Sequence, residues 1–253
     1  MSNIVIDHLS TLSLKLELFY NDTYLSSGTG FLIKSNLGKN YLITNYHVLS
    51  GRRFDTGKCL SAKAAIPNKL KVWQHLEGYL GNWFLKEYEL VNGKGENQWK
   101  EIRYLDKLID VAFLLIEGDE NVKFNYLDIN LAKQDITIAP SEVVSIIGFP
   151  YGKSSDGKFP IWKTGHIASD YDLNYENKPI FLIDATTKEG MSGSPVFIYR
   201  KGCYKTSTGW VLNGVATRFL GIYSGRITGN DDRDIPDIGI VWKPEVLSEV
   251  MKN

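Results

Sequence analysis

The sequence has little cysteine, no long hydrophobic run and no excess of charge, and each absence excludes a class of protein. Its only two cysteines, Cys59 and Cys203, cannot form the disulfide framework of a small secreted domain. The amino end, residues 1–8, shows no basic segment followed by a long apolar stretch, and no other stretch is apolar enough to span a membrane. We therefore expect a cytoplasmic protein without a secretory signal.

The sequence also has no excess of positive or negative charge. The 253 residues include 29 basic and 29 acidic side chains, and the sequence pI is about 6.9. A balanced chain has no global electrostatic attraction for nucleic acid or for an anionic membrane, so we expect neither as a partner. The four histidines stand without paired cysteines, which argues against a zinc site, and we expect no bound metal.

Short strands separated by glycine and asparagine turns dominate the pattern. Leucines at positions 12, 14, 16 and 18 alternate with polar residues, which is typical of a half-buried strand. This spacing favours an all-β barrel or sandwich over alternating strands and helices. Residues 51–107 have no clean period and predict strands with long loops, and 201–209 predicts a polar loop. Further strands are predicted at 31–33, 41–44, 143–148, 161–168, 180–184, 211–223 and 238–242, followed by a short helix over 244–251 that begins with proline.

A serine stands in a glycine-rich turn directly before an apolar strand. Gly190 and Gly193 flank Met191-Ser192, and Pro195-Val196-Phe197 follows. Such a turn lifts the Ser192 hydroxyl to the start of a strand and points nearby backbone N–H groups at whatever it attacks. Alone, this pattern also fits an ordinary tight turn.

Two more residues have the chemistry that a serine nucleophile requires. Asp110 interrupts the apolar run 108–116, so its carboxylate must be paired or hydrogen-bonded there. The predicted strand at 41–44 ends on residues 45–49, which include His47. A serine hydroxyl needs an imidazole as base, and the imidazole needs a carboxylate to hold its tautomer. The order His47, Asp110, Ser192 therefore predicts a catalytic triad.

At these motifs the chain resembles the trypsin-like serine proteases. Thr44-Asn45-Tyr46-His47-Val48, Asp110-Val111-Ala112 and Gly190–Pro195 resemble their histidine, aspartate and nucleophile motifs. The likeness implies two six-stranded antiparallel β-barrels with the site between them, covalent acyl-enzyme catalysis and no cofactor. We expect an amino-terminal barrel over about 8–120, a linker over about 121–141 and a second barrel over about 142–243. Segments that more closely resemble the glutamyl endopeptidase branch are 147–150, 186–187, 194–197 and 221–225.

The resemblance also implies roles for other residues. Gly190 and Ser192 would supply the oxyanion-hole N–H groups, Thr186 the base of the specificity pocket, and Ser224 a hydrogen bond to Asp110. Tyr223 stands where the glutamyl branch has a histidine, so specificity for glutamate does not transfer. Met191 replaces the aspartate that pairs with a new amino terminus in trypsin. The expected pocket wall and substrate-pairing edge strand are Gly221, Ile222, Tyr223, Ser224, Gly225 and Arg226.

The sequence thus predicts a serine endopeptidase that cleaves polypeptides. Two alternatives remain open: a catalytically silent protease fold that binds an extended peptide or partner protein, and an esterase for small molecules. The sequence names no regulatory partner and leaves the side-chain preference undecided between a small residue and an acidic one met by Arg226.

Overall fold

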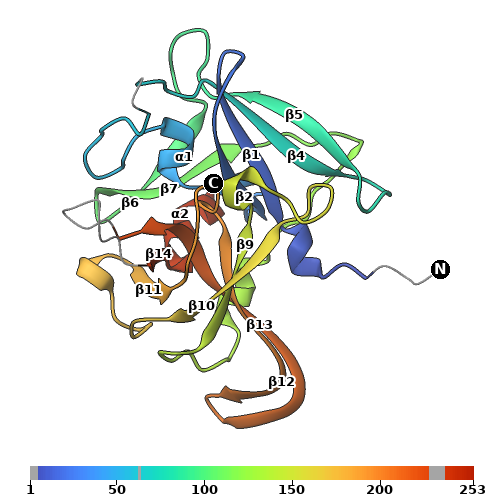
Figure 1. Ribbon diagram of the computed structural model, residues 1–253, viewed down its shortest axis with the longest axis vertical. Coiled ribbons are helices and arrows are strands. Elements are labelled where there is room, and N and C mark those ends of the chain that lie inside the picture. Colours follow the sequence, from blue (N-terminus) through green and yellow to red (C-terminus); the bar gives the residue numbers. More distant parts are fainter. Residues whose placement is uncertain (1–4, 62–63, 228–236) are drawn as a thin grey trace.

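The computed structural model of the protein describes residues 5–61, 64–227 and 237–253. In it, two β-sheets lie against each other, with the second half of the chain below the first in Figure 1. The sequence-based expectations for the amino end and for the two barrel ranges include residues 1–4, 62–63 and 228–236, which lie outside the described part.

The first half of the chain forms one antiparallel sheet of eight strands. Its order is β5-β4-β1-β2-β3-β7-β6, and β8 pairs with β4. Strands β4 to β6 come from the stretch without clean periodicity, so this sheet is larger than the expected six-stranded barrel. The elements are η1 His8–Thr11, β1 Ser13–Tyr20, β2 Thr23–Lys34, β3 Asn40–Thr44, α1 Tyr46–Ser50, β4 Lys69–Leu76, β5 Trp83–Glu89, β6 Trp99–Tyr104, β7 Lys107–Leu115 and β8 Val122–Lys123.

The second half forms a closed ring of six antiparallel strands, in the order β10-β11-β14-β13-β12-β9. The expected pair of six-stranded barrels is therefore met only in part. Strands β9, β11 and β14 have the bounds that the sequence predicted. The elements are η2 Ile129–Lys133, β9 Val143–Gly148, η3 Pro150–Gly152, β10 Ile161–Ile167, η4 Tyr175–Asn177, β11 Ile180–Asp184, β12 Pro195–Thr206, β13 Gly209–Arg226, β14 Ile238–Trp242, η5 Pro244–Leu247 and α2 Ser248–Lys252.

The two sheets share a hydrophobic core. Phe31 of the first sheet meets Phe219 of the second edge to face, with ring centroids 5.9 Å apart. Phe113 and Trp242 belong to the same buried cluster. Burying each such side chain contributes about 1.5–3 kcal/mol, so this shared core holds the two halves in a fixed relation. That relation positions the site, because its residues come from both halves.

One local prediction needs correction. The predicted polar loop 201–209 is instead the distal part of a long hairpin, in which β12 and β13 project away from the body (Figure 1). Polar residues there alternate along paired strands, which a loop-like composition conceals. The prediction of a short carboxyl-terminal helix is confirmed, since the chain turns at Pro244 as a 3-10 helix and continues as α2.

Candidate active site

His47 and Asp110 are brought together from α1 and β7. The sequence placed His47 at a strand end, but β3 stops at Thr44 and His47 lies on the one-turn helix α1, which Gly51 ends in a left-handed conformation. His47 Nδ1 lies 2.7 Å from Asp110 Oδ2. Because a carboxylate accepts this hydrogen bond, Nδ1 carries the proton and Nε2 has the free lone pair. The imidazole is therefore held in the tautomer that can accept a proton.

Asp110 is only 2% exposed, yet its carboxylate is fully hydrogen-bonded. Oδ1 accepts from the His47 backbone N–H at 2.9 Å, and Oδ2 accepts from the His47 ring and the Ser224 hydroxyl. The Asn45 side chain donates to the Asp110 carbonyl at 2.6 Å. The prediction that this buried carboxylate must be paired is confirmed. Ser224 reaches Asp110 because it is the extra residue of a β-bulge opposite β14, which redirects its side chain.

The Ser192 turn depends on two glycines. Gly190 and Gly193 both have φ of +88°, a region that side chains with a Cβ rarely adopt. A Cβ on Gly193 would lie 2.0 Å from the Thr29 carbonyl oxygen, and one on Gly190 would lie 2.3 Å from that of Phe149. Both close approaches hold the turn against the rest of the protein. The turn is therefore fixed by packing as well as by its own backbone.

Within this turn, Gly190 and Ser192 have backbone N–H groups that donate no hydrogen bond to any described residue. The intervening and following N–H groups, of Met191, Gly193 and Ser194, are all bonded. Buried or half-buried backbone donors are rarely left unpaired without a reason. The two free donors are those that the family resemblance named for an oxyanion.

Ser192 itself does not point its proton at the imidazole in this structure. Its hydroxyl donates to the Ser224 carbonyl at 3.0 Å. Ser192 and His47 nevertheless line the same cleft. Hydrogen bonds between nucleophile and base are often loose without a substrate.

Sequence reasoning missed Thr29, a fully buried residue of β2. Its hydroxyl donates to the Gly190 carbonyl at 2.8 Å and accepts from the Phe149 N–H at 3.2 Å. Its backbone N–H donates to the Ser192 carbonyl at 2.9 Å. Thr29 thus joins the first sheet to the Ser192 turn through two hydrogen bonds and to Phe149 through a third. No local signal could have found it, because its partners lie more than a hundred positions away in the sequence.

Thr186, the residue expected at the base of the specificity pocket, differs in burial from its neighbour Thr187. Thr186 is exposed, whereas Thr187 is buried and its hydroxyl is hydrogen-bonded to that of Tyr223. Burial raises the pKa of the Tyr223 phenol above its usual value, so this group stays neutral. The buried residues at this place therefore offer hydroxyl groups and no charge.

The proposed wall residues divide into two groups. Ile222 belongs to the shared core, and Gly221 lies against the Trp242 carbonyl, where a Cβ would be 1.9 Å away. Residues 221–222 pair with β12 on one side, and Ile222 pairs with β14 on the other. A free side of β13 thus begins at Ser224 and includes Gly225 and Arg226.

Arg226 is not a free cation. Its Nη1 lies 3.1 Å from Asp237 Oδ1, and the other carboxylate oxygen of Asp237 accepts from the Thr186 hydroxyl at 3.4 Å. Asp237 was not among the predicted residues. Its only sequence signal is an acidic residue just before a strand, which more often marks a turn.

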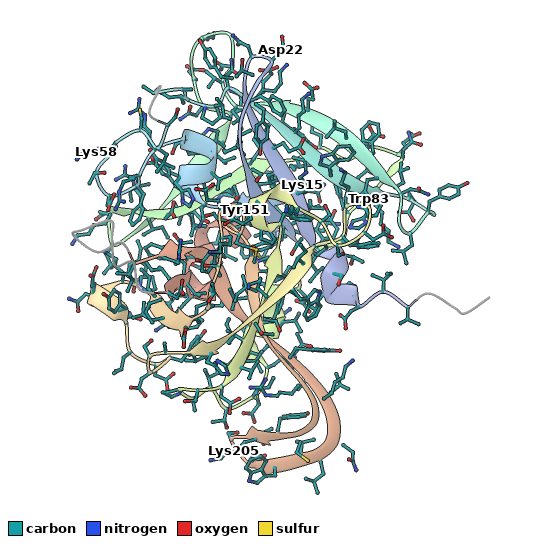
Figure 2. The ribbon with its side chains drawn as sticks, viewed as in Figure 1. Lys15, Asp22, Lys58, Trp83, Tyr151 and Lys205 are labelled. Atoms are coloured by element: carbon teal, nitrogen blue, oxygen red, sulfur yellow. The ribbon has the colours of Figure 1, made fainter. Side chains whose placement is uncertain are left out.

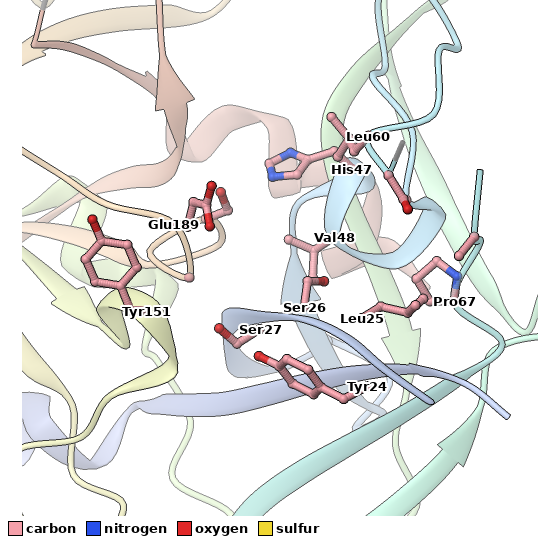
Figure 3. Close-up of a pocket in the computed structure, with 15 residues that line it drawn as sticks. Tyr24, Leu25, Ser26, Ser27, His47, Val48, Leu60, Pro67, Tyr151 and Glu189 are labelled. Atoms are coloured by element: carbon pink, nitrogen blue, oxygen red, sulfur yellow. The ribbon is translucent and has the colours of Figure 1, made fainter. Parts of the chain in front are cut away.

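A cleft of about 630 Å³ opens beside the triad (Figure 3). His47 and Glu189 face it from opposite sides, and Tyr24 lies below them in this view. None of residues 221–226 lines it. The other lining residues are Leu25, Ser26, Ser27, Val48, Gly51, Leu60, Ser61, Ala65, Pro67, Tyr151, Gly190 and Ser192.

No group of three or more His, Cys, Asp or Glu side chains among the described residues is placed to hold a metal ion. No helix in the same part of the chain is long and apolar enough to cross a membrane.

Comparison with known proteins agrees with the geometry. The family model of the trypsin-like peptidase domain matches residues 28–203, so the chain belongs to the trypsin-like peptidases. No curated protein sequence matches it.

Solved structures of serine proteases share the fold at low identity. The serine endoprotease from Yersinia pestis is 16% identical with a TM-score of 0.53, covering 99% of this chain and 67% of that one. The inactive form of Rv3671c from M. tuberculosis H37Rv is 16% identical with a TM-score of 0.50, covering 95% and 85%. The thermostable serine protease AL20 from an extremophilic microorganism is 13% identical with a TM-score of 0.50, covering 97% of both chains.

Proposed function

We propose that the protein is a serine endopeptidase in which Ser192 is the nucleophile, His47 its base and Asp110 the residue that orients the base. The observation that carries this proposal is the hydrogen bond between His47 Nδ1 and the buried Asp110, which leaves Nε2 free in the cleft that Ser192 also lines. Membership of the trypsin-like peptidases supports the same reaction.

In this mechanism Ser192 Oγ bonds to the substrate carbonyl carbon while its proton passes to His47 Nε2. The carbonyl oxygen becomes an oxyanion, which accepts hydrogen bonds from the free N–H groups of Gly190 and Ser192. Each such donor is worth about 2.7–4 kcal/mol in the transition state. His47 then gives its proton to the leaving amine, and the C–N bond breaks to leave an acyl-enzyme. Water, deprotonated by His47, releases the acid and restores Ser192.

A polypeptide is the substrate that the surroundings fit best. The free side of β13 at Ser224–Arg226 offers backbone groups that an extended chain can pair with. The cleft beside His47 contains none of these residues, so we assign it to the chain on the leaving-group side. Glu189 is its only acidic lining residue and forms no ion pair within the described part of the chain, which favours a basic side chain there.

The side-chain preference before the cleaved bond follows from the neutral Thr187–Tyr223 pair. A pocket for lysine or arginine needs a buried carboxylate, and none of the residues that the structure describes places one beside this pair. Arg226 is paired with Asp237, so it binds an acidic substrate side chain less strongly than a free arginine would. We propose cleavage after small or medium uncharged residues. The likeness to the glutamyl endopeptidase branch remains a sequence prediction.

One observation favours the alternative, a silent module that binds an extended peptide. Ser192 is hydrogen-bonded to the Ser224 carbonyl and not to His47. If that bond persisted with substrate present, the hydroxyl would be no nucleophile.

A cleavage-site profile on a peptide library tests the proposal. We expect the wild-type protein to hydrolyse internal bonds and Ser192→Ala to hydrolyse none. Ser248→Ala, which changes an exposed serine at the start of α2, is the matched control and should retain full activity. Hydrolysis by Ser192→Ala would reject the assignment of the nucleophile. Peptide binding without hydrolysis in the wild type would support the silent module.

A further inference from the structure

The projecting β12–β13 hairpin has one face that is exposed along its whole distal length. Across the pairs Lys205–Trp210 and Lys201–Val215, all four side chains are exposed. The residues between them alternate, as strand side chains must, and those on the opposite face are all half-buried. We call the exposed set the outer hairpin face: Lys201, Cys203, Lys205, Trp210, Leu212, Asn213 and Val215.

The outer hairpin face carries large apolar side chains where a solvated strand normally carries polar ones. Trp210 is 69% exposed, Leu212 69% and Val215 67%. Single exposed apolar residues are ordinary, but three together on one strand face mark an interaction surface. The Trp210 indole has no hydrogen-bond partner among the described residues.

The charges of this hairpin are all of one sign. Residues 195–226 contain five basic residues and no acidic residue, whereas the whole chain is balanced at 29 of each. Arg200 and Arg226 are neutralised by Glu142 and Asp237. Lys201 and Lys205 form no ion pair with any described residue. The charge balance of the whole chain therefore conceals a local positive surface.

We propose that the outer hairpin face docks on an anionic lipid bilayer, with Trp210, Leu212 and Val215 entering the interfacial region and Lys201 and Lys205 contacting the headgroups. Tryptophan and lysine are suited to this boundary, since each has an apolar body and a polar end. Basic residues beside an apolar patch add attraction to anionic lipid.

The shape of the molecule supports a bilayer over other occupants. The hairpin extends beyond the rest of the protein, with Lys205 at its far end (Figure 2), so its tip can reach a flat surface before the body does. A second copy is disfavoured, because pairing this face with itself would bring the free lysines together. The expectation of no membrane partner rests on whole-chain charge, which does not describe this local surface, and the present proposal differs from it.

Vesicle co-sedimentation tests the proposal directly. The full chain carrying Ser192→Ala, which prevents self-digestion, should bind vesicles of phosphatidylcholine with about a third phosphatidylserine and should not bind phosphatidylcholine alone. Trp210→Ser with Leu212→Ser should abolish binding. The matched control is Tyr79→Ser with Leu80→Ser, which removes two equally exposed apolar side chains elsewhere and should leave binding unchanged.

The lysines have their own control. Lys201→Glu with Lys205→Glu should weaken binding by more than about fivefold per lysine, the effect of one basic residue near an anionic surface. Lys94→Glu with Lys100→Glu makes the same change of net charge on other exposed positions and should weaken it far less. Hydrolysis of a soluble peptide by the same variants with Ser192 restored should be unchanged, which shows that they fold.

Cys203 reports where the contact forms. A polarity-sensitive dye on Cys203 in a Cys59→Ala background should shift its emission when anionic vesicles are added, whereas the dye on Cys59 in a Cys203→Ala background should not. Absence of vesicle binding, or equal binding to neutral vesicles, would overturn the proposal. Self-association that is lost in Trp210→Ser would instead assign the face to a second copy and would also overturn it.

Discussion

The Thr29 hydroxyl donates to the Gly190 carbonyl at 2.8 Å, so a buried residue of the first sheet fixes the turn of the second half that carries Ser192, the proposed nucleophile. This bond holds the peptide group that follows Gly190, whose own N–H is one of the two proposed oxyanion donors. The candidate site is thus formed by packing of the two halves and by their hydrogen bonds across the interface.

Replacing Thr29 with valine should lower kcat more than it changes KM. Valine fills the same space but leaves the Gly190 carbonyl and the Phe149 N–H without their partner, at a cost of about 1–3 kcal/mol. Steady-state kinetics with a thermal unfolding curve separates lost catalysis from lost stability. Thr44→Val, which removes another buried hydroxyl whose acceptor is the Thr29 carbonyl, should retain more of the turnover. Equal effects of the two variants would mean that Thr29 is only structural.

Removing hydrogen bonds that orient His47 should lower kcat, and the loss should be larger for Asp110 than for Ser224. Asp110→Asn should lower kcat about 10⁴-fold, since an amide favours the wrong imidazole tautomer. Ser224→Ala removes one of three donors to the same carboxylate and should cost about ten- to a hundredfold, as expected for one hydrogen bond to a charged group. Single-turnover rates measure both. A Ser224→Ala loss as large as that of Asp110→Asn would contradict this ranking.

The Arg226–Asp237 pair should control cleavage after acidic residues. Asp237→Asn releases the Arg226 guanidinium, which can then bind a substrate carboxylate through two hydrogen bonds. We expect kcat/KM for peptides with Asp or Glu before the cleaved bond to rise several-fold, and Arg226→Ala added to that variant should remove the gain. Strong cleavage after Lys or Arg by the wild type would show that the pocket lies elsewhere.

Buried His75 should make stability fall in mild acid. His75 is 4% exposed on β4, packs against Trp83 and Phe159, and has no partner for Nδ1 in the described structure. Burial lowers its pKa, with a smaller contribution from nearby Lys123. Below the ordinary histidine pKa of about 6.5, the unfolded chain binds a proton that the folded chain does not, so stability is lost as the pH falls from there toward the folded pKa.

The melting temperature measured between about pH 8 and pH 5.5 checks this. His75→Phe keeps the aromatic contacts without a titrating group and should flatten the decline. His166→Gln, at an exposed histidine of β10, should leave the decline as it is. An unchanged decline in His75→Phe would assign it to other groups.

Much of this architecture follows from local patterns. Leu14, Leu16 and Leu18 face the core as their alternation predicts, and the three triad positions stand at strand or turn signals that short motifs reveal. The sequence singles out Asp110 because burying an unpaired carboxylate in an apolar strand costs free energy.

The features of the fold and of the candidate site that local patterns do not predict depend on contacts between residues distant in sequence. Thr29 has an ordinary strand environment and becomes important only through Gly190 and Phe149. Which of Thr186 and Thr187 is buried depends on the contact of Thr187 with Tyr223, 36 positions along the chain, and no local pattern shows that contact. The stretch 201–209, which holds three residues of the outer hairpin face, predicts a loop because its polar residues mask the pairing of β12 with β13.

Labelling with a fluorophosphonate, followed by intact mass and peptide mapping, tests the central claim most directly. The reagent bonds to a serine hydroxyl only where a base removes its proton and donors hold the resulting oxyanion-like group. We predict a single adduct on Ser192 in the wild type, much slower labelling in His47→Ala and none in Ser192→Ala. A wild-type protein that is not labelled, or an adduct that persists in Ser192→Ala, would contradict the account.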